Sequence, residues 1–135
     1  MLKVALLCFL GNFLGFLLAA CSTSPLKPKI VIVDENMDSE FVELFVNDQI
    51  EIRLPGNPTT GYDWILLGVD YTILEKLGEL EYQSEGDTVG GGGHYTLKLR
   101  AVAPGQTLVE LAYRRSFESE DIPSADEFKI LVRVK

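Results

Sequence analysis

The sequence predicts an all-β domain, an immunoglobulin-like antiparallel β-sandwich of about seven strands. Segments in which apolar and polar residues alternate recur along the chain after residue 29. Loops rich in Gly, Pro, Asn, Asp and Ser separate these segments at roughly 10-residue spacing, as in two-sheet sandwiches. The 135 residues are enough for one packed domain and too few for two of ordinary size. We therefore expect a single core between two sheets.

The first three elements lie between residues 29 and 54. Residues 29–33 (KIVIV) are β-branched and predict a strand. Residues 40–46 (EFVELFV) fit a helix and a strand equally well, so their periodicity decides nothing. Residues 49–54 (QIEIRL) alternate strictly between apolar and polar side chains, which predicts an antiparallel strand with one buried face.

The remaining elements follow the loop at residues 56–62. Residues 63–69 (DWILLGV) predict a strand, and residues 71–80 allow a helical turn in which Ile73, Leu74 and Leu77 would share a face. Alternation then returns in three further segments, which predict strands at residues 95–103, 106–113 and 128–134.

The first twenty residues predict a signal segment rather than part of the fold. A short positive start precedes an apolar run over residues 4–20. The run ends in Leu18-Ala19-Ala20-Cys21, which resembles the bacterial lipobox. This resemblance implies cleavage before Cys21 and a lipid on its thiol. An uncleaved transmembrane anchor is the alternative, because the run is at the lower limit for crossing a bilayer.

The predicted organisation is a lipoprotein-type signal peptide at residues 1–20, a lipidated N-terminus and polar tether at 21–29, and the sandwich domain at 30–135. The expected location is a bacterial cell envelope, held by lipid. Ser22 in place of Asp after the cysteine favours an outer membrane where the cell has one.

Composition excludes several function classes. Twelve Lys and Arg against 20 Asp and Glu give a formal net charge of −8, which opposes binding to a nucleic-acid backbone. Cys8 and Cys21 both lie near the N-terminus, so the domain has no disulfide framework and no cysteine metal site. His94 is the only histidine, and no GxSxG, HExxH or EF-hand pattern occurs. We expect no catalytic residue, no metal and no cofactor.

The loop at residues 56–62 is the first of three with unusual chemistry. Pro58 fixes its own φ and restricts Asn57, while Gly61 can adopt a positive φ. We expect the loop to be stiff, with the hydroxyls and amides of Thr59 and Thr60 directed outward. An ordinary turn is the alternative reading of this segment alone.

The second and third loops offer bare backbone and an aromatic anchor. Four consecutive glycines at residues 90–93 cost much conformational entropy on ordering, so we expect their exposed backbone to pair with a partner. They lack the Lys and Ser or Thr of a phosphate-binding loop. Residues 113–117 (YRRSF) end a strand in two arginines and an exposed aromatic, which are residue types that anchor protein interfaces.

The order of these three motifs resembles the chagasin family of cysteine-peptidase inhibitors, over residues 29–135. Residues 57–62 (NPTTGY) match its most specific motif, and the four glycines meet its GxGG loop. The third motif departs, because Ser116 and Phe117 follow Arg115 where the family has Pro and Trp. Because a phenylalanine ring buries less area than an indole, we expect a lower affinity. The resemblance to the family is affected less.

The resemblance implies reversible, competitive inhibition of papain-like peptidases of the cathepsin L type by a wedge of three loops. Thr59 and Thr60 would cover the catalytic cysteine and histidine, and the glycines would lie along one cleft wall. Phe117, supported by Arg115, would pack on the other wall. The implied binding residues are Asn57, Pro58, Thr59, Thr60, Gly61, Tyr62, Gly90, Gly91, Gly92, Gly93, Arg115 and Phe117.

Two other functions remain open from the sequence alone. A Ser-His-Asp enzyme is not excluded by counting residues, although His94 adjoins four glycines rather than an orienting shell. A non-inhibitory immunoglobulin-like envelope lipoprotein that binds another protein is the stronger alternative, since a fold does not define a function. An inhibitor acting alone needs no second copy, so we expect a monomer.

Overall fold

The computed structural model describes residues 27–87 and 90–135 and confirms the all-β prediction. The predicted signal segment and lipidation site at Cys21 lie outside the described residues. Two short 3-10 helices accompany the strands, η1 (Glu35–Met37) and η2 (Pro58–Thr60). The described residues form nine strands, which are β1 (Ile30–Asp34), β2 (Phe41–Leu44), β3 (Gln49–Gly56), β4 (Asp63–Gly68), β5 (Leu74–Lys76), β6 (Glu81–Ser84), β7 (Gly93–Ala101), β8 (Gly105–Arg114) and β9 (Asp126–Val134).

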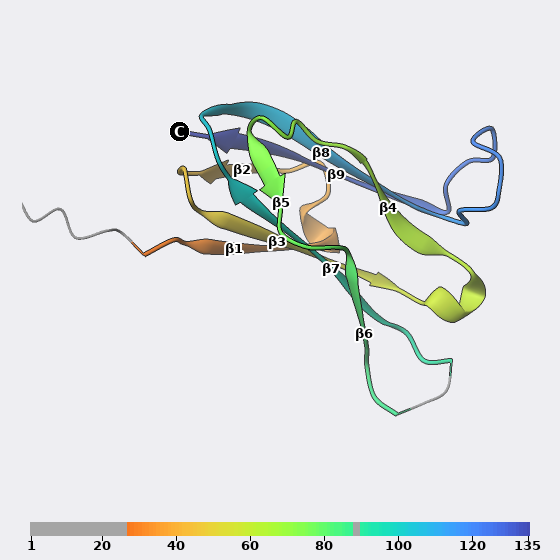
Figure 1. Cartoon of the computed structure of the whole chain (residues 1–135). Helices are drawn as coiled ribbons and strands as arrows, with labels where there is room; N and C mark the ends of the chain where they lie inside the picture. The colour runs from red at the N-terminus through yellow and green to blue at the C-terminus, as the bar shows by residue number, and fades with distance from the viewer. Residues whose placement is uncertain (1–26, 88–89) are drawn as a thin grey trace, which may run out of the picture.

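The strands form two sheets that face each other (Figure 1). The first sheet has the order β1-β3-β7-β5, and β6 also pairs with β7. The second sheet has the order β2-β9-β8-β4. The central pairings are antiparallel as predicted, whereas the edge pairs β1 with β3 and β2 with β9 are parallel. This follows from η1, which carries the chain from an edge of one sheet to an edge of the other.

The core lies between the sheets and comes from the inward residues of the alternating strands. In β3, Ile50, Ile52 and Leu54 are buried as the sequence predicts. In β7, buried and half-buried residues alternate along the whole strand, with Leu97 and Leu99 in the core. Each buried aliphatic side chain contributes about 1.5–3 kcal/mol relative to exposure. The core therefore holds the strand ends, and the loops between them, in place.

The helical turn predicted at residues 71–80 is wrong. Asp70 caps a tight turn through its side chain, which accepts hydrogen bonds from the Thr72 amide and hydroxyl. Leu74 then pairs with Ala101 at the start of β5. Ile73 and Leu74 are both buried. Burial against β7 outweighs the weak helical spacing of these apolar residues.

The last of the four glycines belongs to the sheet rather than to the loop. Gly93 opens β7 and pairs with both Gly56 in β3 and Ser84 in β6. A Cβ atom at position 93 would lie 2.2 Å from the Gln83 carbonyl oxygen. The unpredicted strand β6 thus approaches β7 as closely as only glycine permits.

Replacing Gly93 with alanine should therefore lower the free energy of unfolding by about 1–3 kcal/mol. The new methyl group must push β6 away from β7. Urea unfolding followed by the fluorescence of Trp64 measures the change. Gly92→Ala is the matched control, because its Cβ would lie 3.6 Å from its nearest neighbour, the Gly56 oxygen, in ordinary contact. Equal stability of both variants would contradict a tight β6–β7 approach.

Candidate functional site

The threonine loop, residues 57–62, is a capped 3-10 turn between β3 and β4. Asn57 is extended, as expected before proline, and its side chain accepts a hydrogen bond of 3.1 Å from the Thr59 amide. Gly61 ends the turn with a φ of +81°, in the left-handed region that favours glycine. Pro58 lies at the first position of the turn. The Asn57 cap, Pro58 and the left-handed Gly61 therefore explain the predicted stiffness of this loop.

The hydroxyls of the two threonines point back into the loop, and the prediction that they face outward is wrong. The Thr59 hydroxyl lies 2.6 Å from the Asn57 side-chain oxygen, and the Thr60 hydroxyl lies 2.6 Å from the Asn57 carbonyl oxygen. Asn57 offers acceptors at short range, so the hydroxyls donate within the turn. Both residues remain exposed, but their amides, which were also predicted to face outward, donate to Asn57 as well.

A tyrosine from the second sheet holds the base of the threonine loop. The Tyr113 hydroxyl accepts a hydrogen bond of 2.8 Å from the Asn57 amide. The ring of Tyr113 also packs between Tyr62 and Trp64, with centroid distances of 5.4 Å and 5.2 Å. Sequence reasoning missed this contact. The only signal was that Tyr113 falls on the inward side of a strand next to the loop.

Replacing Tyr113 with phenylalanine should lower the free energy of unfolding by about 1–2 kcal/mol, because it leaves the Asn57 amide without this acceptor. The loop should also exchange its amide hydrogens faster, which hydrogen exchange at Asn57 and Thr59 measures. Tyr71→Phe is the control, since Tyr71 is 60% exposed. Unchanged exchange in the Tyr113 variant would show that the aromatic packing alone holds the loop.

The glycine loop, residues 90–93, lies beside the threonine loop. The Asn57 side-chain amide donates a hydrogen bond of 2.9 Å to the Gly90 carbonyl oxygen. Gly90 and Gly92 are exposed, Gly91 is half-buried and Gly93 is buried in β7. Backbone without side chains is therefore accessible to a partner at the first three positions. The fourth glycine is required by the close approach of β6 to β7.

The third loop, residues 114–119, reaches the threonine loop through Arg115. Its guanidinium donates a hydrogen bond of 3.4 Å to the Thr60 carbonyl oxygen and lies 4.6 Å from the centre of the Tyr62 ring. The same group is 3.2 Å from the Glu118 carboxylate and 6.0 Å from the Phe117 ring centre. Phe117 is 76% exposed, as the sequence predicts.

Arginines take the place of proline in stiffening this loop. Arg114 donates hydrogen bonds to the carbonyl oxygens of Glu118 and Ser119, and the Glu118 amide bonds the Arg115 carbonyl. These bonds close a tight turn that contains Ser116 and Phe117. The missing proline of the third motif therefore does not leave the loop without support.

The three predicted loops meet at one end of the sandwich, with the threonine loop in the middle (Figure 1). Asn57 binds the glycine loop and Thr60 binds the third loop. All twelve predicted binding residues lie in these loops or at their edges. The family model described as "Chagasin family peptidase inhibitor I42" matches residues 43–132, a span that contains all three loops.

The chain belongs to the chagasin family of peptidase inhibitors. Amoebiasin-1 of Entamoeba histolytica is 28% identical over 100 residues, which are 74% of this chain and 93% of that protein. The crystal structure of the cysteine protease inhibitor EhICP2 from the same organism has a TM-score of 0.72 at 24% identity, over 79% of this chain and 96% of the other. The solution structure of Amebosin has a TM-score of 0.62 at 28% identity, over 81% and 100%.

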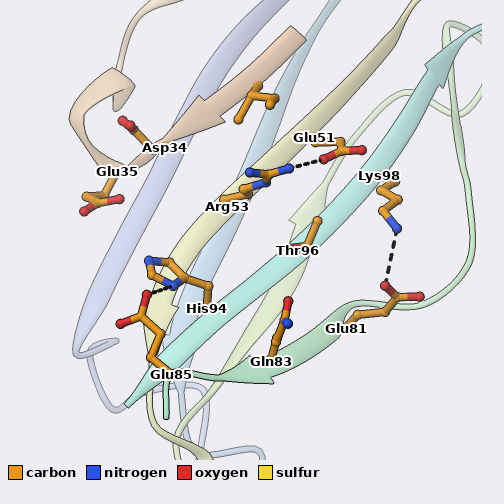
Figure 2. Close-up of a pocket in the computed structure, with 11 residues that line it drawn as sticks. Asp34, Glu35, Glu51, Arg53, Glu81, Gln83, Glu85, His94, Thr96 and Lys98 are labelled. Atoms are coloured by element: carbon orange, nitrogen blue, oxygen red, sulfur yellow. Dashed lines mark hydrogen bonds and ion pairs between the residues drawn. The ribbon is translucent and has the colours of Figure 1, made fainter. Parts of the chain in front are cut away.

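The outer face of the first sheet forms a shallow, charged groove (Figure 2). None of the twelve predicted binding residues of this chagasin-family chain lines it. Its cations are matched by neighbouring carboxylates, as in Arg53 with Glu51 at 2.8 Å and Lys98 with Glu81 at 3.4 Å. His94 lies 2.7 Å from Glu85. Within residues 27–87 and 90–135, no group of three or more acidic, histidine or cysteine side chains is arranged to hold a metal ion. No helix in the same residues is long and apolar enough to cross a membrane.

A partly buried hydrogen bond joins the two sheets beneath the loops of the chagasin-family site. The Tyr95 hydroxyl donates to the Asp63 carboxylate at 2.6 Å, and Tyr95 is 5% exposed. Burial, and then the hydrogen bond to Asp63, raise the pKa of Tyr95 well above its ordinary value of 10.0. The phenol therefore stays protonated in the folded chain at a pH where the unfolded chain has lost this proton.

Stability should consequently fall as the pH rises above about 10, by at most about 1.4 kcal/mol per pH unit from this group. The unfolded state binds fewer protons there, so the contribution of Tyr95 is complete below that pH and is lost above it. Urea unfolding between pH 8 and pH 11 should show a smaller decline for Tyr95→Phe than for the wild type. Equal slopes would rule out this contribution, and Tyr71→Phe serves as the exposed control.

Proposed function

We propose that the domain inhibits papain-like cysteine peptidases reversibly and competitively, by inserting the threonine loop and its two neighbours into the active-site cleft. One observation carries the proposal. The threonine loop is hydrogen-bonded to both flanking loops, so the three form a single projecting edge rather than three separate loops. A preformed edge loses little conformational entropy on docking, which favours tight binding.

The chemistry of the edge fits a cleft that ends in a cysteine and a histidine. Thr59 and Thr60 form an exposed turn whose hydroxyls and amides all donate to Asn57 within the loop. The loop brings no nucleophile of its own, and the hydrogen-bonded turn resists the extended conformation that a peptidase substrate adopts. Contact with the catalytic groups therefore blocks them without presenting a peptide bond that they can cleave.

The flanks supply the remaining contacts. Gly90 and Gly92 are exposed and carry no side chain, so one wall of the cleft can approach their backbone closely, although their carbonyl oxygens already accept from Asn57 and Glu85. On the other side, the exposed ring of Phe117 lies next to Arg115, which also contacts Tyr62. An aromatic ring beside an arginine is a frequent anchor of protein interfaces.

Inhibition can be tested with residues 22–135 titrated against papain and a cathepsin L-type peptidase, using a fluorogenic substrate. We expect loss of activity at a one-to-one ratio of inhibitor to enzyme, with an apparent inhibition constant that rises with substrate concentration. A serine peptidase of similar size is the control and should be unaffected. A folded domain with no effect on either cysteine peptidase at micromolar concentration would contradict the proposal.

We also propose that the chain acts from a bacterial envelope, attached through a lipid on Cys21. The lipobox-like ending of the apolar run supports this attachment. Mass spectrometry of the protein expressed in a bacterium should show the loss of residues 1–20 and the mass of the added acyl groups. Retention of Met1 to Ala20 would contradict it.

A further inference from the structure

The end of the sandwich opposite the three loops carries a group of exposed apolar side chains. Phe45 and Val46, in the turn between β2 and β3, are 66% and 37% exposed. Val102, just after β7, is 38% exposed. A hydrogen bond of 2.8 Å from the Asn47 amide to the Ala101 carbonyl oxygen holds the two segments together. We call Phe45, Val46 and Val102 the apolar end.

Hydrogen bonds in the turn hold the exposed Phe45 in a fixed position. Asp48 is 8% exposed, and its carboxylate accepts hydrogen bonds of 2.9 Å from the Phe45 amide and from the Lys29 amide. Asn47 has a φ of +78°, in the left-handed region, which completes the tight turn. These contacts fix the backbone on both sides of the exposed ring.

Both ends of the described chain reach the same place. The Gln49 amide donates to the Lys29 carbonyl oxygen, and the Lys135 amide donates to the Leu44 carbonyl oxygen, at 2.8 Å and 2.9 Å. Figure 1 shows the start of β1 and the C-terminus at this end, with the three loops at the other. The chain that leads to Cys21 therefore leaves the domain beside the apolar end.

The distance to the lipidated residue is short. Lys29 is 29 − 21 = 8 residues after Cys21. Eight residues span at most about 28 Å when fully extended. A lipid on Cys21 would thus keep the apolar end within reach of the bilayer surface at all times.

We propose that the apolar end docks on the surface of the lipid bilayer that holds Cys21, so that the three loops point away from the membrane. The proposal rests on the lipid anchor. A phenylalanine and two valines can insert among the headgroups. Lys29 lies beside their turn through its amide, which donates to Asp48, and a lysine next to apolar residues is common at membrane interfaces. The net charge of −8 repels anionic headgroups, so this contact adds orientation to an attachment that the lipid provides.

The test uses the full chain, expressed in a bacterium and reconstituted into phosphatidylcholine vesicles with or without bromine atoms on the acyl chains near the headgroups. Phe45→Trp places a fluorescent side chain at the apolar end. Ile122→Trp is the matched control, because Ile122 is 46% exposed and its amide donates to the Ser119 carbonyl oxygen in the third loop. Trp64 is buried in every variant and gives a common background, which the wild type measures.

We expect brominated vesicles to reduce the emission of the Phe45→Trp variant beyond that of the wild type, and to leave Ile122→Trp at the wild-type level. Chains that float with vesicles but show no extra loss at position 45, or equal loss at both positions, would overturn the proposal and leave the anchor intact. A chain that does not float would overturn both. A blue shift without quenching in the Phe45→Trp variant would indicate cover by a second copy and would also overturn it. Inhibition is measured separately, so its failure is distinguishable.

Discussion

Replacing Phe117 with alanine should weaken the inhibition of a papain-like peptidase by about 2–4 kcal/mol, or roughly 30- to 700-fold in the inhibition constant. The ring is 76% exposed in the free domain and stands next to Arg115 at the outer edge of the three loops. Burial of an exposed aromatic ring against an apolar cleft wall is the largest single gain that this edge offers. The loss should appear in the inhibition constant and leave the stability of the free domain unchanged.

Phe45→Ala is the matched control for this prediction. Phe45 is also an exposed phenylalanine, at 66%, but it belongs to the turn between β2 and β3, and that turn is at the opposite end of the sandwich (Figure 1). Its removal should leave the inhibition of a soluble peptidase at the wild-type level. Equal effects of the two substitutions, or none from Phe117→Ala, would mean that the third loop does not contact the peptidase.

The double substitution Thr59→Gly and Thr60→Gly should weaken inhibition by about 2–3 kcal/mol, or roughly 30- to 150-fold. It removes the two hydroxyl bonds to Asn57 at 2.6 Å each and adds two flexible residues to the centre of the wedge. The loop would then lose more entropy on entering the cleft. Steady-state inhibition constants for wild type and variant measure the effect.

Thr72→Gly is a control with the same local chemistry. The Thr72 amide and hydroxyl both donate to the Asp70 carboxylate, as those of Thr59 do to Asn57, but this turn lies in the connection before β5. It should lower stability slightly and leave inhibition unchanged. If the double variant inhibits as well as the wild type, the threonine loop does not make the contact with the peptidase.

Much of the fold could be predicted because strand alternation is a local signal. The inward positions of β3 follow directly from the spacing of Ile50, Ile52 and Leu54. The stiffness of the threonine loop likewise follows from Pro58 and Gly61, whose backbone preferences act within a few residues. Where a single residue type dictates the local backbone, the sequence was a sufficient guide.

The features that escaped prediction depend on contacts between distant segments. Strand β6 (Glu81–Ser84) has few apolar residues and forms because Gly93 allows it to approach β7. The inward turn of the threonine hydroxyls depends on the orientation of Asn57, which Tyr113 and Gly90 hold from other strands and loops. The parallel edge pairs depend on where the chain changes sheets, which local patterns do not encode.

The central claim is that the three loops cover the catalytic cysteine of the target, and alkylation of that cysteine tests it most directly. Papain is mixed with a small excess of residues 22–135, iodoacetamide is added, and the modified cysteine is measured over time by mass spectrometry. We predict that the wild-type domain suppresses alkylation, that Phe45→Ala does so equally, and that the threonine-loop double variant does so less at the same concentration. Unchanged alkylation at concentrations that still inhibit substrate cleavage would place the domain elsewhere on the peptidase and contradict the wedge.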